Sequence, residues 1–523
     1  MKTVRLIPGL PLVALLLTGC TVGPHYQAPQ TSTPPRFWEI KAVANGADLA
    51  VNESPTVDRW WQTFHDPELE SLVSRAMKSN LDLRQAVSRV RQARIQRAIA
   101  TAGLFPSIDI DGGYNRGRGS RNVVLPFGNA APASSSGNAS RSESRETAEG
   151  APAPTPMPPA GGGAPAGPMS PLGEGGLPGV TTNLYQVGFD ASWEIDLFGA
   201  RRRMIEAADA AVSSAEDARE GAVVTLLGEL AQTYLQLRAA QARRDLARRN
   251  VELATDTLKV VVAKAKTGFA TDLEVARQRA ELAALQSVQP AFETEVRLGM
   301  HGLATLLAEP VGALVGELEA TAPLPELPTA VVVGLPSDLL RRRPDVRRAE
   351  RELAGATART GVATADLFPH FDLAAAFGLD SSQPGNLADW SSHYYSITPG
   401  FRWPILDWGA ARGGVRLAEE MQREARIRYD AVVMQSLADV ENALAKLHGE
   451  ERAHQARVVA VTASREAFTI ADQMYRHGLV DSLSVLEAQR SLVASQDALV
   501  QSDAALRIDL VTLYKALGGG WEG

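Results

Sequence analysis

The segment Trp193–Ala200 reads WEIDLFGA, and the segment Trp403–Ala410, which begins 210 positions later, reads WPILDWGA. The same offset separates Lys266–Phe269 (KTGF) from Arg476–Leu479 (RHGL). One offset that is shared by separate segments indicates an internal duplication and not a chance match. The chain is therefore expected to consist of two structural repeats with the same order of elements.

Another matching pair of segments locates an insertion in the first repeat. Leu104–Pro106 and Leu367–Pro369 both read LFP, but 263 positions separate them, so the first repeat carries 53 additional residues. We place these residues in Arg116–Thr182, which is rich in Gly, Ser, Ala and Pro. Such a composition cannot bury a core, so it predicts a mobile loop.

Alternating segments precede each long helical stretch. In Tyr185–Leu197 the odd-numbered residues are apolar, and the even-numbered residues are polar or glycine. A period of two over this length predicts a strand long enough to cross a bilayer at a tilt. Ile397–Ile405 repeats the pattern, and shorter strands are expected at Ile108–Tyr114 and Phe371–Phe377.

A soluble sheet with one wet face would show the same alternation. Aromatic residues, however, gather near the strand ends, as they do at the two interfaces of a membrane. The predicted interfacial girdle comprises Tyr185, Trp193, Phe198, Tyr395, Trp403 and Trp408.

The number of strands bears on the number of chains. No stretch after Cys20 is apolar enough for a transmembrane helix, so a spanning structure would have to be a β-barrel. Two strands per repeat give four per chain, whereas the smallest common outer-membrane barrels have about eight. An open sheet edge is not tolerated in lipid, so several chains must share one barrel. Three chains would give a barrel of about twelve strands, which is in the usual range.

Long helices follow the strands. Gly199–Lys266 and Gly409–His477 contain almost no Gly or Pro. At about 1.5 Å per residue, each helix would run roughly 100 Å. Apolar residues in Val433–Leu447 recur with the 4,3,4,3 spacing of a coiled coil.

Turn residues follow both long helices. Gly268 and Gly478 suit a left-handed helix end. Thr271 with Glu274 resembles a capping box, and Asp481 is a good N-cap for the second return helix. Each repeat is therefore predicted to form a coiled-coil hairpin.

The first residues resemble the signal of a bacterial lipoprotein. The apolar stretch Leu6–Leu17 is too short to span a bilayer, and it leads into Leu17–Cys20 (LTGC), a lipobox-like motif with the chain's only cysteine. We expect cleavage before Cys20 and lipidation of its thiol; an ordinary signal peptide is the alternative. Each buried methylene adds about 0.8 kcal/mol, so two or three acyl chains would anchor the protein. Thr21, where an Asp would resemble an inner-membrane retention signal, favours the outer membrane.

The sequence offers no sign of an enzyme. It contains no P-loop, HExxH, GxSxG or Cys-His zinc motif. We therefore expect no catalytic residue, no metal and no cofactor apart from the covalent lipid on Cys20. A net charge of -7 disfavours nucleic acid as a partner.

Taken together, the chain resembles the TolC-like outer membrane factors, and specifically the NodT-type lipoproteins of resistance-nodulation-division (RND) efflux systems. The resemblance is carried by Cys20–Pro29 (CTVGPHYQAP), Gly334–Glu350 (GLPSDLLRRRPDVRRAE), Tyr475–Gly478 (YRHG) and Leu486–Leu492 (LEAQRSL). It extends from Cys20 to about Leu517, apart from the insertion. It implies an α+β membrane protein: a homotrimer with a twelve-stranded β-barrel, four strands per chain, continued by a periplasmic α-helical coiled-coil barrel.

The resemblance also implies residues that close the periplasmic end of the duct. The matching positions are Tyr475, Arg476, Leu483, Glu487 and Arg490. Here the acid at 487 is Glu where the family often has Asp, which displaces the ring of charges slightly. The alternative is that Glu487 and Arg490 form an ordinary i,i+3 pair on a wet helix face.

The turns at the hairpin ends are the implied contact with a periplasmic adaptor. The residues concerned are Gly268, Phe269, Gly478 and Leu479. Turn geometry alone would also account for the two glycines, and both roles are compatible.

The implied function is that of a passive exit duct for drugs or other small toxic compounds, which is opened by the adaptor and an inner-membrane RND pump. An exit duct for type I secretion or for another pump, a structural envelope tether and a membrane-anchored enzyme are the alternatives. We expect a signal peptide at 1–19, a lipidated segment at 20–68, the first repeat at 69–308, a linker at 309–336, the second repeat at 337–518 and a tail at 519–523.

Overall fold

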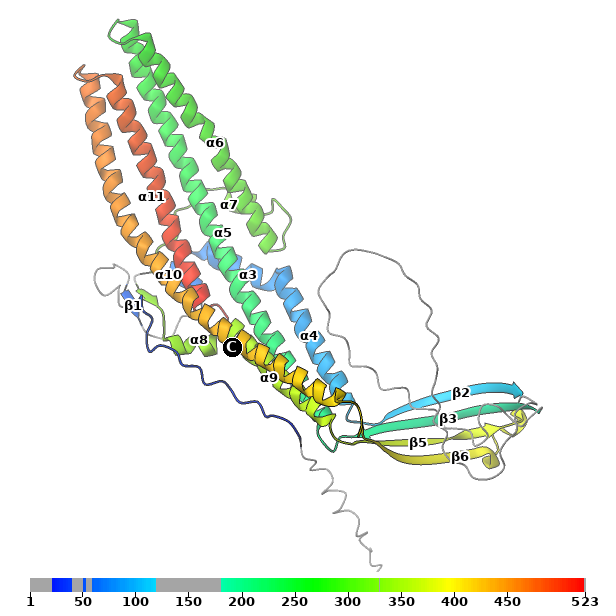
Figure 1. Cartoon of the computed structure of the whole chain (residues 1–523). Helices are drawn as coiled ribbons and strands as arrows, with labels where there is room; N and C mark the ends of the chain where they lie inside the picture. Colours follow the sequence, from blue (N-terminus) through cyan, green and yellow to red (C-terminus); the bar gives the residue numbers. More distant parts are fainter. Residues whose placement is uncertain (1–20, 40–49, 53–58, 119–179, 329, 522–523) are drawn as a thin grey trace, which may run out of the picture. The chain divides into compact units, whose positions relative to one another are not determined.

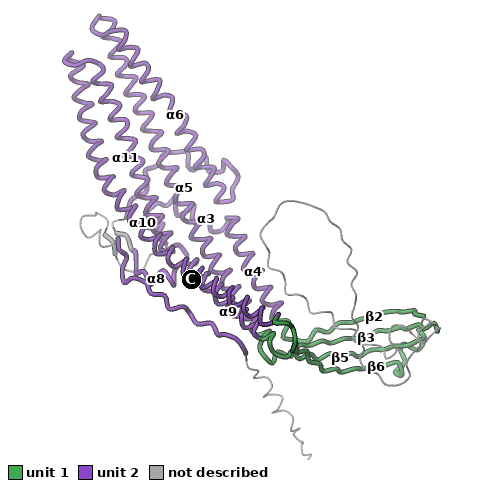
Figure 2. The backbone as a smooth tube through the Cα atoms, viewed as in Figure 1, with its two compact units in different colours: residues 1–21, 101–202, 365–409 green, residues 22–100, 203–364, 410–523 purple. Residues whose placement is uncertain are grey.

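The computed structural model describes residues 21–39, 50–52, 59–118, 180–328 and 330–521. Cys20 and most of the predicted insertion lie outside the described residues. The chain divides into two compact units, which are coloured separately in Figure 2. Residues 1–21, 101–202 and 365–409 form the first unit, and residues 22–100, 203–364 and 410–523 form the second.

The first unit is built around one antiparallel sheet of four strands in the order β2-β3-β5-β6 (Figure 1). The strands are β2 (Ser107–Arg118), β3 (Thr181–Ile195), β5 (His370–Ser381) and β6 (His393–Arg402). All four strands that the alternation predicts are therefore confirmed.

The register of the sheet places the apolar residues on one face. Ile110, Phe189, Phe377 and Tyr395 are paired across the four strands and form a single row. Each of these side chains is about half exposed or more in the isolated chain. The neighbouring row, on the opposite face, begins with Asp109 paired with Asp190. The sheet thus has an apolar face that the described part of the chain leaves exposed.

Both repeats hold their strands with the same hydrogen bond. The Trp193 indole N–H donates to the carbonyl oxygen of Leu104 at 2.9 Å. The Trp403 indole N–H donates to the carbonyl oxygen of Leu367 at 3.1 Å. Since both pairs join the duplicated tryptophan to the duplicated LFP segment, this contact confirms the duplication.

The loop prediction was too wide at both ends. Arg116–Arg118 belong to β2, and Arg118 pairs with Thr181 at the start of β3. Backbone pairing continues through residues whose side chains give no strand signal, since the ladder needs only N–H and C=O groups.

The second unit contains the helices, and their lengths repeat. They are α3 (Pro67–Ser79), α4 (Leu81–Ala102), α5 (Ala200–Lys266), α6 (Asp272–Leu306), α7 (Val315–Leu318), α8 (Pro336–Arg342), α9 (Pro344–Ala365), α10 (Ala410–Arg476) and α11 (Ser482–Ala516). Both α5 and α10 have 67 residues, both α6 and α11 have 35, and both α4 and α9 have 22. Figure 1 shows α5 with α6 and α10 with α11 as two hairpins, here the first and the second hairpin.

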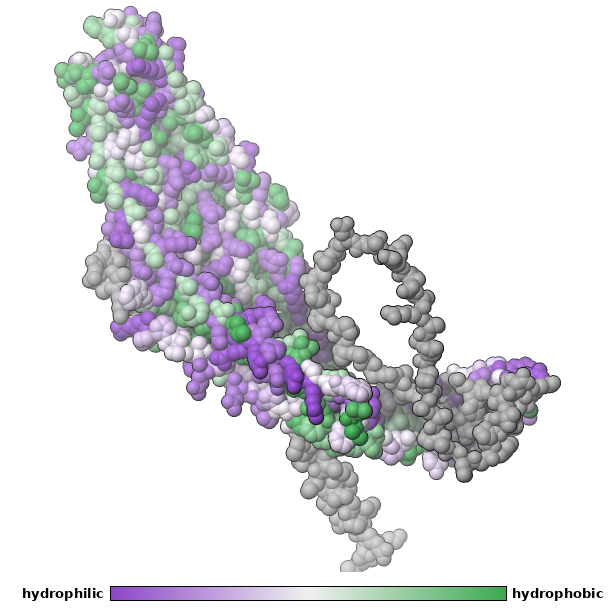
Figure 3. All heavy atoms as spheres, viewed as in Figure 1, coloured by the Kyte–Doolittle hydropathy of each residue, from purple (hydrophilic) through white to green (hydrophobic). Residues whose placement is uncertain are grey.

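The main core of this unit lies away from the hairpin turns. It is lined by leucines of the long helices, among them Leu227, Leu303 and Leu510, all fully buried. The Trp60 ring, from a short 3-10 helix (Trp60–Phe64), stacks on Tyr514 with centroids 5.5 Å apart. A two-stranded parallel sheet joins β1 (Ala50–Asn52) to β4 (Ala330–Val332). Figure 3 shows hydrophilic and hydrophobic residues interspersed on the visible face of the helices.

Within the described ranges, none of the helices combines the length and the apolar character that crossing a membrane requires.

Candidate functional site

The two hairpin turns have the same backbone geometry. Gly268 and Gly478 both have φ of 78°, a left-handed conformation in which a Cβ is strained. The Phe269 N–H donates to the carbonyl of Lys264 at 2.8 Å, and the Leu479 N–H donates to the carbonyl of Met474 at 2.9 Å. The predicted glycine-ended helices are thus confirmed.

The predicted caps of the return helices are also confirmed. The Glu274 N–H donates to the Thr271 hydroxyl at 3.3 Å, and the Thr271 N–H donates to the Glu274 carboxylate at 3.4 Å. In the second hairpin, the Asp481 carboxylate accepts from the Ser484 N–H at 3.1 Å. The hydrogen bonds from Ser484 lower the pKa of Asp481.

These hydrogen-bonded turns present two large apolar side chains to solvent. The Phe269 side chain is 83% exposed, and that of Leu479 is 71% exposed. They occupy equivalent places in the duplication. The turns therefore offer one apolar projection per hairpin.

A small apolar cluster joins the two hairpins behind the turns. Each of four helices contributes one buried residue: Val261 from α5, Val275 from α6, Tyr475 from α10 and Val485 from α11. We call these four residues the tip cluster. The Lys264 ammonium lies 4.0 Å from the centre of the Tyr475 ring and donates to its backbone carbonyl.

The Tyr475 hydroxyl is buried within this cluster. Burial, with the negative charge of nearby Glu274, raises the pKa of Tyr475 to about 12. A side-chain hydrogen bond with Glu274 adds to this rise. Tyr475 thus contributes its ring to the cluster, and its hydroxyl lies near Glu274 of α6.

One ion pair connects the hairpins further along the return helices. The Arg490 Nε and Nη2 atoms lie 2.7 and 2.6 Å from one carboxylate oxygen of Glu281. The Glu281 side chain is 8% exposed and that of Arg490 is 60% exposed. The hydrogen bond to Glu281 raises the pKa of Arg490. Because Glu281 belongs to α6 and Arg490 to α11, this pair holds the first hairpin to the second.

The ion pair bears on the predicted gate residues of α11. Within one chain Arg490 forms its ion pair with Glu281, and the charge of Glu487 also acts on it. Glu487 is exposed, and Leu483 is 38% exposed. Leu483, Glu487 and Arg490 are spaced by four and three residues, which places them on one stripe of α11.

Arg476 lies at the end of α10 and is held locally. Its guanidinium donates to Asp472, one turn earlier, at 2.8 Å, and its side chain is 58% exposed. The structure therefore places four of the five predicted gate residues at the surface of the hairpins and only Tyr475 in the interior.

The predicted girdle residues have several environments. Tyr185 stacks on Tyr114 with centroids 4.7 Å apart, and Phe198 stacks on Phe368 at the same distance. Trp193 and Trp403 make the indole hydrogen bonds to the LFP segments described above. Tyr395 and Trp408 are 74% and 92% exposed.

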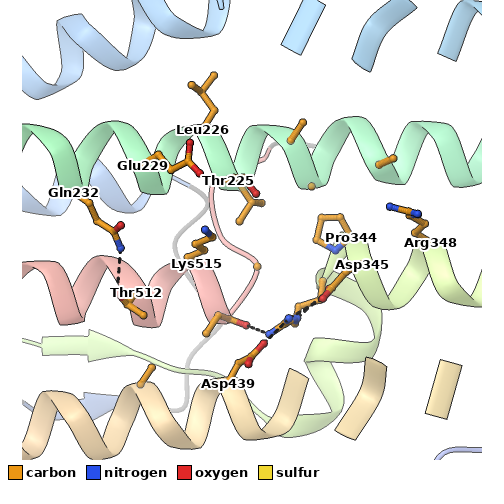
Figure 4. Close-up of a pocket in the computed structure, with 18 of the residues that line it drawn as sticks. Thr225, Leu226, Glu229, Gln232, Pro344, Asp345, Arg348, Asp439, Thr512 and Lys515 are labelled. Atoms are coloured by element: carbon orange, nitrogen blue, oxygen red, sulfur yellow. Dashed lines mark hydrogen bonds and ion pairs between the residues drawn. The ribbon is translucent and has the colours of Figure 1, made fainter. Parts of the chain in front are cut away.

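A cavity of about 780 Å³ opens among α5, α10 and α11, beside the start of α9 (Figure 4). It is lined by charges of both signs. Arg343 lies at its wall and bonds to Asp345 at 2.7 Å, to Asp439 at 2.9 Å and to the carbonyl of Ala516 at 3.0 Å. The pattern is that of a structural junction.

The same junction exists in the first repeat with a neutral residue. The Asn80 side chain donates to the carbonyl of Leu306 at 2.8 Å. Asn80 and Arg343 are 263 positions apart, and Leu306 and Ala516 are 210 apart, so both are duplicated positions. In each repeat this residue closes the end of the return helix.

Asp217 also lines the cavity and is 2% exposed. Arg347 contacts its carboxylate at 2.5 Å. Burial nevertheless outweighs this attraction and raises the pKa of Asp217 to about 6.

Comparison with known proteins decides the family. The model of the outer membrane efflux protein family matches residues 72–309 and 335–519. The chain belongs to this family. A curated relative, the pyoverdine export outer membrane protein OpmQ of Pseudomonas putida, is 32% identical over 98% of this chain and 97% of its own length. Nodulation protein T of Rhizobium leguminosarum bv. trifolii is 28% identical, with 98% and 97% coverage.

Solved structures agree with this assignment. The outer-membrane channel OprN superposes with a TM-score of 0.81 at 30% identity, covering 96% of this chain and 100% of its own. The predicted fold class is thus confirmed: a TolC-like trimeric channel fold to which each chain gives four strands and long helices. The protein is an outer membrane efflux channel and not an enzyme. Among the described residues, no group of three or more His, Cys, Asp or Glu could hold a metal ion.

Proposed function

We propose that three copies of this chain form an exit duct for small toxic molecules. The duct is closed at the hairpin tips and is opened there by a periplasmic adaptor and an RND pump. The observation that carries this proposal is the pair of hairpins joined at their tips by the tip cluster and by the Glu281–Arg490 ion pair, within a member of the efflux family.

The sheet supports a shared barrel. In the described chain, β2 and β6 each have one edge without a partner strand. Unpaired backbone groups are not tolerated in lipid. Pairing of β2 in one chain with β6 in the next removes every edge, and the exposed row from Ile110 to Tyr395 then faces lipid.

The tips support a gate. The Glu281–Arg490 pair spans two hairpins, so it must break or rearrange if one hairpin moves away from the other. The exposed stripe of Leu483 and Glu487 is then the part of α11 available to constrict a pore. A ring of leucines can stop conduction by dewetting, and a ring of carboxylates selects ions by charge.

The turns support an adaptor contact. Phe269 and Leu479 project from equivalent glycine turns, and apolar side chains exposed at rigid sites are typical of interaction surfaces. A trimer would present each residue three times. A second protein with repeated hairpins could therefore engage all tips alike.

The N-terminal segment supports a lipid anchor at Cys20. Thr21, the first described residue, packs so closely on Gly199 that a Cβ there would meet Thr21 Cα at 2.9 Å. Gly199 follows β3, so the chain next to Cys20 is held where a membrane strand ends. Anchoring the duct in the outer membrane by acyl chains fits this position.

Relatives suggest the class of cargo. One is named for export of pyoverdine, and the family itself is named for efflux. We infer that this chain also serves small molecules and not folded proteins.

Conductance in planar lipid bilayers tests the proposal. The purified full chain is expected to give small, mostly closed channels, and Glu281→Ala should raise the open fraction. Lys259→Ala is the matched control, because Lys259 pairs with Asp256 on an exposed face of α5. A protein that never forms channels would favour the alternative role as a structural envelope tether. Equal conductance of wild type and all variants would refute the proposed gate.

A further inference from the structure

The two return helices have one regular row of core positions each. On α6 the row runs Val275, Gln278, Leu282, Leu285, Gln289, Phe292, Val296, Gly299 and Leu303, and on α11 it runs Val485, Gln489, Leu492, Gln496, Leu499, Asp503, Leu506, Leu510 and Leu513. Successive members alternate between three and four residues apart, as in a coiled-coil seam. Most members are buried or half-buried in one chain.

The half of each row nearest the turn contains glutamines. Gln278 is 3% exposed and Gln489 is 0% exposed. Among the described residues, the Gln278 Nε2 atom and both amide atoms of Gln489 lack a hydrogen-bond partner, as does the Gln496 Oε1 atom. An unpaired buried amide destabilises the packed state, and a polar seam residue lowers coiled-coil stability.

Apart from Asp503 on α11, the other half of each row is apolar, and its members nearest the main core are deeply buried. Leu303, Leu506, Leu510 and Leu513 are all 3% exposed or less and belong to the main core. Apart from Asp503, the polar positions of the two rows therefore lie in the half nearer the turns, between the tip cluster and the main core.

A clamp lies at the boundary between the two halves. Arg243 of α5 bonds to Asp497 of α11 at 2.7 Å and approaches Glu295 of α6 at 3.6 Å. Its guanidinium lies 4.5 Å from the centre of the Phe292 ring. Two residues before Phe292, Pro290 interrupts the hydrogen-bond ladder of α6. The contacts of Arg243 and the part of α6 that Pro290 weakens thus lie at the same height along the helices.

We propose that the buried glutamines set the threshold for opening. The glutamine seam keeps the closed tip only marginally stable, so that the hairpins part between the turns and the Arg243 clamp while the main core stays intact. Gln489 contributes most to this low stability, since its side chain is fully buried and both of its amide atoms lack a hydrogen-bond partner among the described residues. This inference rests on the proposed gate.

Hydrogen exchange of the full-length, detergent-solubilised protein tests the inference without a conductance readout. Gln489→Leu should slow exchange in peptides from residues 480–496 about ten-fold, which equals about 1.4 kcal/mol. Peptides from residues 503–516 should not change. Gln489→Glu should accelerate exchange of the same tip peptides, because it buries a charge.

Two further variants keep the test decisive. Gln278→Leu repeats the change on the other return helix, and Gln286→Leu is the control at an exposed position of that helix. Unchanged or faster exchange in both seam variants would overturn the proposal. If Glu281→Ala opens the channel while Gln489→Leu changes neither exchange nor open fraction, the gate stands and this inference fails. If Gln489→Leu slows exchange but Glu281→Ala leaves conductance unchanged, the weak seam stands and the gate fails.

Discussion

Replacing Arg490 by alanine should open the channel. The change removes a guanidinium whose two nitrogens contact a Glu281 carboxylate that is 8% exposed. Removing one partner of a fully buried pair costs about 3–5 kcal/mol, because the other charge is left without compensation. Arg490 itself is 60% exposed, so solvent screens much of the attraction. We therefore expect about 1–2 kcal/mol per chain.

A trimer multiplies this effect if its three chains open together. The closed state would then lose about 3–6 kcal/mol, which raises the ratio of open to closed channels by about 10²- to 10⁴-fold. Single-channel recording in planar bilayers measures this ratio directly. Antibiotic leakage into cells that carry the variant gives a second readout.

A charge swap separates latch breaking from a general change of charge at the pore. Glu281→Arg combined with Arg490→Glu restores an ion pair across the same helices and should close the channel again. The single and double alanine variants should be non-additive, since both remove one interaction. Wild-type conductance in Arg490→Ala, or additive effects without rescue by the swap, would refute the latch.

Four further outcomes are expected. The folded-state pKa of Asp217 is about 6, above the ordinary aspartate value of 3.8, so wild type loses up to about 3 kcal/mol of stability as the pH rises through this window. The melting temperature of Asp217→Asn should therefore rise relative to wild type from pH 4 to pH 7, and a difference that does not change with pH would contradict this. Arg343→Ala should destabilise the helical unit by about 3 kcal/mol in thermal unfolding followed by circular dichroism, and Arg343→Lys should not restore it, because lysine cannot span three acceptors. Phe269→Glu with Leu479→Glu should abolish efflux and leave trimer and conductance intact, whereas normal efflux would remove the adaptor assignment. Cys20→Ser should lose the acyl mass in mass spectrometry, and a mature protein whose mass changes only by the exchange of sulfur for oxygen would indicate an ordinary signal peptide.

Local and repeated features of the fold were predictable from the sequence. Apolar alternation gave the four strands, since a strand exposes alternate residues to opposite faces. The turn glycines, Thr271 and Asp481 gave the hairpin ends, since caps depend on only a few neighbouring residues. The common offset gave two repeats, and both then showed helices of equal length.

The partner of Arg490 was not predictable. Glu281 lies on another hairpin, 209 residues away. The second repeat has no equivalent acidic residue, because the position 210 residues after Glu281 is Ser491. Contacts between hairpins depend on how whole helices are rotated against each other, which no local pattern records. The burial of the seam glutamines is likewise not predictable, since glutamine is ordinary on a helix surface and is unusual only where a helix packs it into the interior.

The native mass of the detergent-solubilised, full-length protein tests the central claim most directly. A shared barrel predicts a complex of three chains that survives purification, because β2 and β6 of each chain are paired with neighbours. A stable monomer would leave both edge strands unpaired and the apolar row exposed, and it would contradict the duct.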